Sequence, residues 1–318
     1  MAKGKSRNHH WWPVGLQNYW SDENGDVSWI DPDGNTDKKK SVNRKIGFKI
    51  HGHTLFRGHV WGESNFENEF DIDDKIHKII ANLKSLKPRG EHISPLISWW
   101  KSIRKNDLVL NDTCAKHHIK EQDSRDLLLF LYSLLIRSPS YRSKYEKFPA
   151  QFGLPVSENV GKANMRQSYL LAKKLCQEGV MTNRFFVILH SDHSRFICGD
   201  GYLDWLSGSL QARRVNGRAL IPLTPHLCVY ICTPMAMRTD RNCAAIRAAP
   251  WMVERVNEIT QVYSRDRLFF LGRKPQLSEN FLKREFLEHS NYKVDLLDKL
   301  DEIAQPNTHW GGLNAFNL

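Results

Sequence analysis

With 318 residues, 41% of them hydrophobic, the chain can bury a substantial core as one large domain or two small ones. No apolar run is long enough to span a bilayer, and the basic N-terminus lacks the apolar segment of a secretory signal. These features exclude a membrane-spanning or secreted protein, so we expect a cytoplasmic protein without a membrane partner.

The net charge and the cysteine pattern indicate which kinds of ligand the protein binds. A net charge of +11 favours a polyanion such as nucleic acid, although a solvated basic surface without a ligand explains the same excess. The candidate nucleic-acid-binding residues are the basic clusters Lys38, Lys39, Lys40 and Arg213, Arg214. The six cysteines are scattered without a CxxC pair, which indicates reduced core thiols and not a zinc site.

The first 60 residues are predicted to be rich in β-structure. A dense aromatic patch begins at His9-His10 and includes Trp11, Trp12 and Trp20. So many tryptophans are expected to pack onto the body of the protein, and the same segment offers a possible contact for a protein partner. Val27–Ile30 and Ser41–Ile50 flank the turn Asp31–Gly34 and predict an N-terminal β-hairpin.

Residues 65–180 are predicted to be mainly helical. Apolar residues of Phe66–Leu83 recur at helical spacing, and acidic residues occupy the first turns, as suits the positive end of a helix dipole. Asp123–Arg137 predicts an almost wholly buried helix that stops before Pro139. Arg137 either caps the negative end of this helix or presents a fixed guanidinium to an anion or carboxylate.

The segment 184–235 is predicted to form the central sheet. Phe185–Leu189 and Phe196–Cys198 flank a polar turn and predict a buried hairpin, which ends at Asp200 between two glycines. Leu227–Cys232 is expected to join the same sheet, and helices are expected over 250–305. The predicted fold is therefore α+β over residues 1–318 as a single compact domain, with a mostly antiparallel central sheet, an N-terminal β-hairpin and several packed helices.

Several short elements occur in one order from residue 9 to about 270. They are His9-His10-Trp11-Trp12-Pro13, Leu16-Gln17-Asn18-Tyr19, Phe66–Ile80, Arg137-Ser138-Pro139, Gly199-Asp200-Gly201-Tyr202, Pro222-Leu223-Thr224-Pro225 and Val256-Asn257. Together they resemble an uncharacterised, mainly bacterial family, domain of unknown function 4238. The resemblance implies site positions but no activity. Two departures stand out: of the family's Ser-Asp-Asn-Pro element only Asp200 remains, and its paired glutamates align loosely with Glu67 and Asp73.

The sequence and the resemblance point to one candidate site. We expect His10 as general base, Arg137 stabilising anionic charge, Asp200 as the partner of Arg137, and Glu67, Asp73 and Asp200 as ligands of Mg²⁺ or Mn²⁺. This set suits a metal-dependent phosphodiesterase or nuclease, or another phosphate-directed hydrolase. Two alternatives stay open, a non-catalytic module that binds nucleic acid or a nucleotide, and a protein-interaction subunit. No nucleotide-cofactor motif such as a P-loop or GxGxxG occurs.

Overall fold

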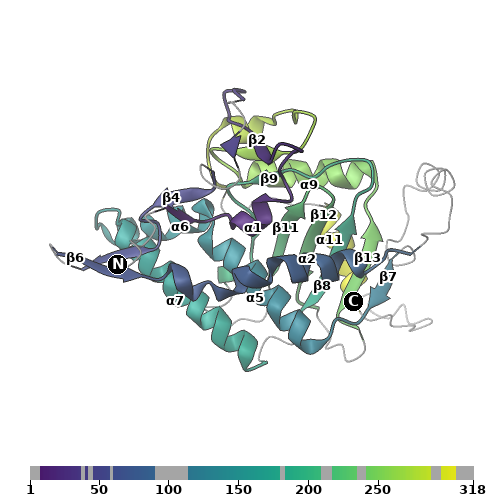
Figure 1. Cartoon of the computed structure of the whole chain (residues 1–318), viewed down its shortest axis with the longest axis horizontal. Helices are drawn as coiled ribbons and strands as arrows, with labels where there is room; N and C mark the ends of the chain where they lie inside the picture. Colours follow the sequence, from purple (N-terminus) through teal and green to yellow (C-terminus); the bar gives the residue numbers. More distant parts are fainter. Residues whose placement is uncertain are drawn as a thin grey trace, which may run out of the picture.

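The computed structural model describes residues 8–36, 40–41, 46–57, 60–89, 114–179, 183–208, 217–234, 241–287 and 295–305. Its fold is α+β, as predicted, and is built on a six-stranded sheet in the order β10-β11-β12-β8-β13-β7 (Figure 1). The strands are β7 (Ala115–His117), β8 (Phe185–His190), β10 (Leu203–Asp204), β11 (Arg218–Thr224), β12 (Leu227–Cys232) and β13 (Cys243–Arg247). Only β8 and β13 run parallel, so the prediction of a mostly antiparallel sheet is confirmed.

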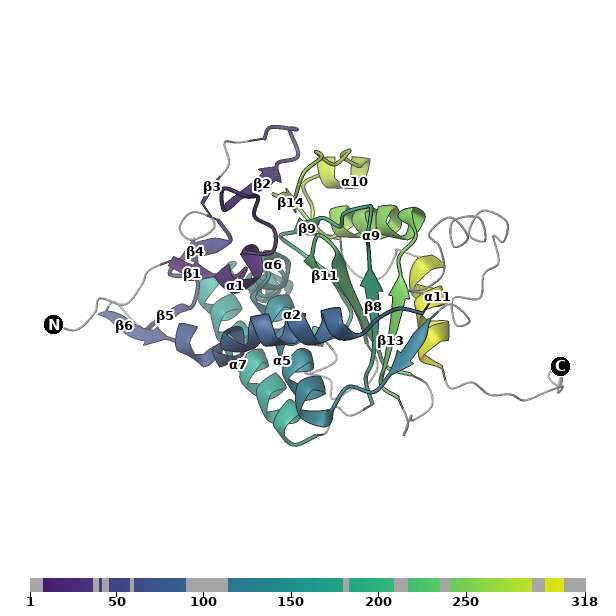
Figure 2. The same ribbon diagram turned by 45° about the vertical axis from the view of Figure 1, so that its right-hand side comes forward.

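Helices cover both faces of this sheet, which explains the continuous apolar sequence of β8 and β12. One face packs against α11 (Asp295–Ala304), while α2 (Ile76–Ser85) and α5 (Glu121–Arg137) lie on the other (Figure 2). The other helices among the described residues are α1 (Val14–Gln17), α6 (Pro139–Glu146), α7 (Glu158–Gln177), α9 (Pro250–Val262) and α10 (Glu279–Leu282). None of the described helices is long and apolar enough to cross a membrane.

The predicted hairpin of Phe185–Leu189 with Phe196–Cys198 is wrong. Both edges of β8 already have partners, β12 on one side and β13 on the other, so no edge remains for a returning strand. The chain instead crosses to a four-stranded sheet in the order β3-β2-β14-β9, where β9 (Cys198–Gly199) pairs with β14 (Leu268–Phe270). Strand pairing far along the chain therefore overrides the local turn signal.

The N-terminal hairpin is confirmed in its first half. β2 (Asp26–Ile30) pairs antiparallel with β3 (Lys40–Ser41). The rest of the predicted returning strand goes elsewhere, because β4 (Phe48–Ile50) pairs with β1 (Asn8–His10). A further hairpin, β5 (Thr54–Arg57) with β6 (Val60–Asn65), follows it.

The aromatic N-terminal segment packs onto the body, as expected. Trp12 and Trp20 are completely buried, and the Trp12 ring lies 4.4 Å from that of Phe269 in β14. The indole N–H of Trp20 donates to the carbonyl of Leu223 in β11 at 3.0 Å. Because Trp11 is also only 9% exposed, these three rings offer little exposed surface to a protein partner.

The acidic stretch before α2 differs from the predicted helix start. It forms two 3₁₀ turns, η1 (Glu67–Glu69) and η2 (Asp71–Lys75). Their carboxylates pair with cations of two helices: Asp73 contacts Arg137 of α5, while Glu69 and Asp71 contact Arg166 and Lys173 of α7. The acids therefore join helices in the tertiary structure and do not serve as a first helical turn.

After α5 ends, α6 begins directly at Pro139. The hydroxyl of Ser138 caps it by accepting the N–H of Tyr141.

Candidate functional site

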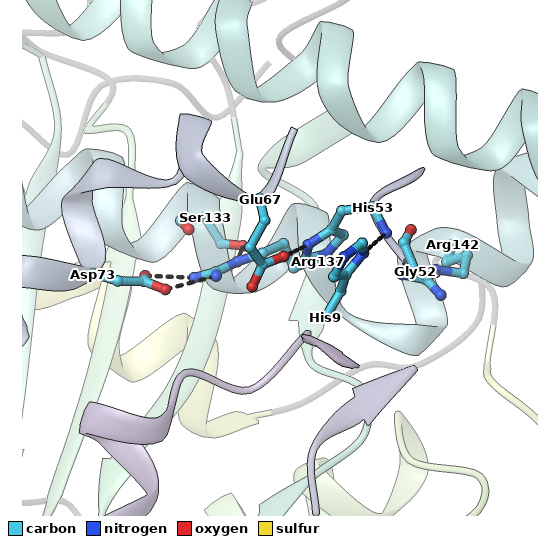
Figure 3. Close-up of polar contacts among 8 residues, drawn as sticks. All are labelled: His9, Gly52, His53, Glu67, Asp73, Ser133, Arg137 and Arg142. Carbon is cyan, nitrogen blue, oxygen red and sulfur yellow. Dashed lines mark hydrogen bonds and ion pairs between the residues drawn. The ribbon is translucent and has the colours of Figure 1, made fainter. Parts of the chain in front are cut away.

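Two histidines and a glutamate from three separate segments converge beside the end of α5 (Figure 3). His9 comes from β1, His53 from the turn between β4 and β5, and Glu67 from η1. Each offers one nitrogen or oxygen, and these atoms all lie within 4.8 Å of one another. The imidazoles of His9 and His53 stack at 5.2 Å with 15° between their planes, and His53 Nδ1 contacts Glu67 Oε2.

A tight turn places His53 opposite His9. The Gly52 N–H donates to the Lys49 carbonyl, and the Thr54 N–H donates to the His51 carbonyl. His51 takes a left-handed backbone conformation (φ 53°), which costs a non-glycine residue about 1 kcal/mol. On the other side, Arg142 of α6 donates to the Gly52 carbonyl at 3.3 Å. The β1–β4 pairing and α6 thus hold the turn from both sides.

The surroundings favour neutral imidazole and a carboxylic acid of reduced acidity. Burial lowers the pKa of His53 well below its usual value, and the nearby charges of Arg137 and Arg142 lower it further. Burial raises the pKa of Glu67, against the opposing effect of Arg137 and His9. The His53 Nε2 atom is buried and has no hydrogen-bond partner among the described residues. A buried polar atom without a partner lowers the stability of the folded state unless it binds a ligand or a proton.

The hydrogen bond between the two histidines fixes a tautomer. The backbone N–H of His53 donates to His9 Nδ1 at 2.7 Å, so in neutral His9 the proton is on Nε2. A metal bound to His9 through Nδ1 would replace this hydrogen bond. Binding through Nε2 would move the proton to Nδ1, where it would face another donor. Either mode requires a small shift of the turn that carries His53.

Arg137 lies beside this cluster but pairs with Asp73, not with Asp200. Its two terminal nitrogens donate to the two Asp73 carboxylate oxygens at 2.8 and 2.7 Å, and its Nε donates to the Ser133 carbonyl. The guanidinium also covers the Phe70 ring at 4.5 Å. The expected carboxylate partner exists, but it comes from η2. Because all three guanidinium nitrogens donate to protein oxygens, Arg137 holds η2 against the end of α5.

Asp200 is buried at the end of β9, where it accepts the backbone N–H groups of Arg265 at 2.9 Å and of Asp266 at 3.0 Å. The predicted pairing with Arg137 is therefore wrong. The carboxylate is satisfied by the chain that follows α9 and leads into β14. It also lies outside the His9–His53–Glu67 group, so Glu67, Asp73 and Asp200 do not form the expected carboxylate set.

His10 follows His9 on β1 and is half-buried. Burial lowers the pKa of His10, and the charge of Arg137 also lowers it. The carboxylates of Glu67 and Asp73 act in the opposite direction. Its Nε2 has no hydrogen-bond partner among the described residues. The structure thus groups His10 with Glu67, Asp73 and Arg137. Of the basic clusters, Lys38, Lys39, Arg213 and Arg214 lie outside the described residues, and only the backbone of Lys40, in β3, is described.

Sequence reasoning missed His9 and His53. On a strand the two adjacent histidines must point to opposite sides, and the structure buries His9 while leaving His10 partly exposed. That alternation signals that one of the pair is internal, but not which one. His53 occurs in His51-Gly52-His53, where no local pattern distinguishes it from a surface turn. In comparisons with known proteins, no family model, no curated protein and no solved structure matches the chain.

Proposed function

We propose that the protein is a metal-dependent hydrolase whose metal is held by His9, His53 and Glu67. The observation that carries the proposal is the convergence of two buried imidazoles and a carboxylate within 4.8 Å. Two histidines and one glutamate, with a fourth position left for water, are a common ligand set of catalytic zinc. A bound metal would supply a hydroxide near neutral pH by lowering the pKa of its water.

The ligand chemistry favours Zn²⁺ over Mg²⁺ and Mn²⁺. Magnesium prefers oxygen ligands and near-ideal octahedral geometry, whereas imidazole suits zinc and other transition metals. The sequence-based expectation of Mg²⁺ depended on a carboxylate set of Glu67, Asp73 and Asp200. Asp73 and Asp200 instead engage their oxygens with Arg137 and with backbone amides.

A phosphodiester is the substrate class that the charge supports. The net charge of +11 attracts polyanions. His10, half-buried and electrostatically coupled to Glu67, is our candidate for moving a proton during the reaction. Arg137 has a positioning role in this proposal, because its guanidinium holds the Asp73 carboxylate.

The test begins with the full chain stripped of metal. Zn²⁺, Mn²⁺ or Mg²⁺ is then titrated by calorimetry, and the cleavage of single-stranded DNA and of a chromogenic phosphodiester is followed. We expect about one Zn²⁺ per chain, with the affinity reduced about 100-fold or more in His53→Ala and Glu67→Gln. His10→Ala should keep the metal but lose roughly 10²- to 10⁴-fold in rate.

His190→Ala is the matched control. His190 is another half-buried histidine, at the end of β8, and lies outside the three-residue cluster. This variant should bind metal as the wild type does. Equal loss of metal in His190→Ala, or no stoichiometric binding by the wild type, would contradict the proposed metal site. Metal binding without cleavage of any phosphodiester would contradict the hydrolase.

A further inference from the structure

A ten-residue run without a charged side chain, Phe148–Ser157, connects α6 to α7. It begins with the 3₁₀ turn η3 (Phe148–Phe152). Its four large apolar side chains are exposed to solvent: Phe148 by 45%, Phe152 by 69%, Leu154 by 60% and Val156 by 61%. Single exposed apolar residues are ordinary, but four within nine residues mark an interaction surface.

The run is a folded loop with a closed base. The Leu154 N–H donates to the Pro149 carbonyl at 3.1 Å, and the Ser157 N–H donates to the Glu146 carbonyl at 3.0 Å. Lys49 of β4 contacts Glu146 at 3.5 Å and Glu158 at 3.0 Å, so it joins both ends of the loop. The next residue on that strand is Ile50, which is also exposed. The loop is therefore held in place while its apolar side chains point outward.

The charges around the loop are mainly positive. Lys144 and Lys147, in and just after the last turn of α6, are exposed directly before the apolar run. The two carboxylates at its base, Glu146 and Glu158, are contacted by Lys49, and Lys162 lies 3.4 Å from Glu158. Four lysines against two glutamates leave the base of the loop cationic.

We propose that this apolar loop docks the protein on an anionic lipid surface. Phenylalanine and leucine side chains insert at the boundary between headgroups and acyl chains, and flanking lysines attract acidic headgroups. A protein partner is less favoured, since a stable protein interface takes about 20–30 residues on each side and this surface has about ten. The expectation of no membrane partner depended on the lack of a spanning segment, which surface docking does not need.

Docking would bring the candidate site to the lipid surface. Arg142 of α6 donates to the Gly52 carbonyl in the turn that carries His53, and β4 and α6 lie side by side (Figure 1). The loop and the histidine cluster therefore share one rigid base. The proposal does not depend on hydrolysis, because vesicle binding is measured without substrate.

The test is flotation of the full chain with vesicles of phosphatidylcholine, alone or mixed with phosphatidylserine. We expect binding to the mixed vesicles, and loss of about fivefold in affinity for each of Lys144→Gln and Lys147→Gln. The double variant Phe152→Asp/Leu154→Asp should lose binding while its melting temperature stays unchanged, because both side chains are exposed. Trp251→Asp on α9, which removes a side chain of 46% exposure elsewhere, is the matched control and should bind normally.

Insertion can also be observed directly. All six native cysteines are buried, so a Leu154→Cys variant can be labelled at that position with a polarity-sensitive dye. Its emission should shift to the blue with mixed vesicles. Failure to bind any vesicle, or binding that survives Phe152→Asp/Leu154→Asp, would overturn the proposal. Self-association through the loop would also overturn it. That outcome would appear as a lower molar mass of the double variant than of the wild type, with no binding of the wild type to lipid.

Discussion

Arg137 and Asp73, 64 residues apart in sequence, form a two-pronged ion pair that joins the C-terminal end of α5 to the 3₁₀ turn η2. The Arg137 side chain is 1% exposed and that of Asp73 is 30% exposed. A buried guanidinium without a partner is costly, so this pair explains why an arginine can end an otherwise apolar helix. It also explains the position of η2 beside the histidine cluster.

Asp73→Ala should therefore destabilise the protein by about 2–3 kcal/mol. Removing one partner of a buried pair costs roughly 3–5 kcal/mol, and the partial exposure of Asp73 lowers the figure here. Chemical denaturation measures the change, and Asp73→Ala/Arg137→Met should recover part of it. As a control, Asp200→Ala and Arg137→Met should be additive within about 0.5 kcal/mol. Strong coupling between Asp200 and Arg137 would contradict the pairing described here.

Gly201→Ala should be strongly destabilising although it adds a single methyl group. A Cβ at Gly201 would lie 1.9 Å from the backbone carbonyl oxygen of Tyr263, which cannot move independently of the end of α9. We expect a loss of about 3 kcal/mol or more in the free energy of unfolding, at the upper end for overpacking. Gly208→Ala is the control, because its added Cβ would meet nothing within 4 Å. Equal stability of the two variants would show that the backbone at Tyr263 can shift to accommodate the added methyl group.

The sequence predicted secondary structure and burial correctly where the signal was local and strong. The apolar period of α5 and the continuous apolar run of β12 predicted both elements and their burial. It failed where a residue's partner comes from far along the chain. Arg137 requires some carboxylate, and the sequence-based choice was Asp200. The packing of η2 against α5 instead brings Asp73 to the guanidinium. His53 was missed for the same reason, since its partners belong to β1 and η1.

Trp20 should be an anchor for the N-terminal segment. Its ring is fully buried, and its indole N–H donates to the Leu223 carbonyl in β11. Trp20→Ala should cost about 3–5 kcal/mol, whereas Trp20→Phe, which keeps an aromatic ring but loses the donor, should cost about 1–3 kcal/mol. Thermal unfolding distinguishes the two. An unchanged melting temperature in Trp20→Ala would show that the segment is dispensable for folding.

Binding to nucleic acid, if phosphate neutralisation dominates it, should weaken steeply with salt. The motivation is the net charge of +11 together with the clusters Lys38–Lys40 and Arg213-Arg214. Fluorescence anisotropy with labelled single-stranded DNA gives the affinity at several salt concentrations. Substituting one cluster with glutamine should reduce the slope of log affinity against log salt by about 0.7 for each phosphate that the cluster neutralises. Absence of binding at low salt would remove nucleic acid as a partner.

The buried carboxylate of Asp200 should make stability depend on pH in a direction opposite to that of an ordinary ion-paired acid. Burial raises its pKa from 3.8 to about 6, even though two backbone amides donate to it. Between these two pH values the folded state binds more protons than the unfolded state does. The free energy of unfolding therefore falls as pH rises through this range, and above it the ionised group costs about 3 kcal/mol.

Asp200→Asn isolates this effect, because asparagine does not titrate while Glu67, His10 and His53 titrate in both proteins. Relative to the wild type, the variant should be more stable at about pH 8 than at about pH 4, by up to about 3 kcal/mol. The amide oxygen can accept only one of the two N–H groups well, so the variant is expected to be the less stable protein near pH 4. Urea denaturation at both pH values measures the difference. Parallel pH profiles of the two proteins would show that Asp200 stays ionised throughout and that its two backbone donors offset the cost of burial.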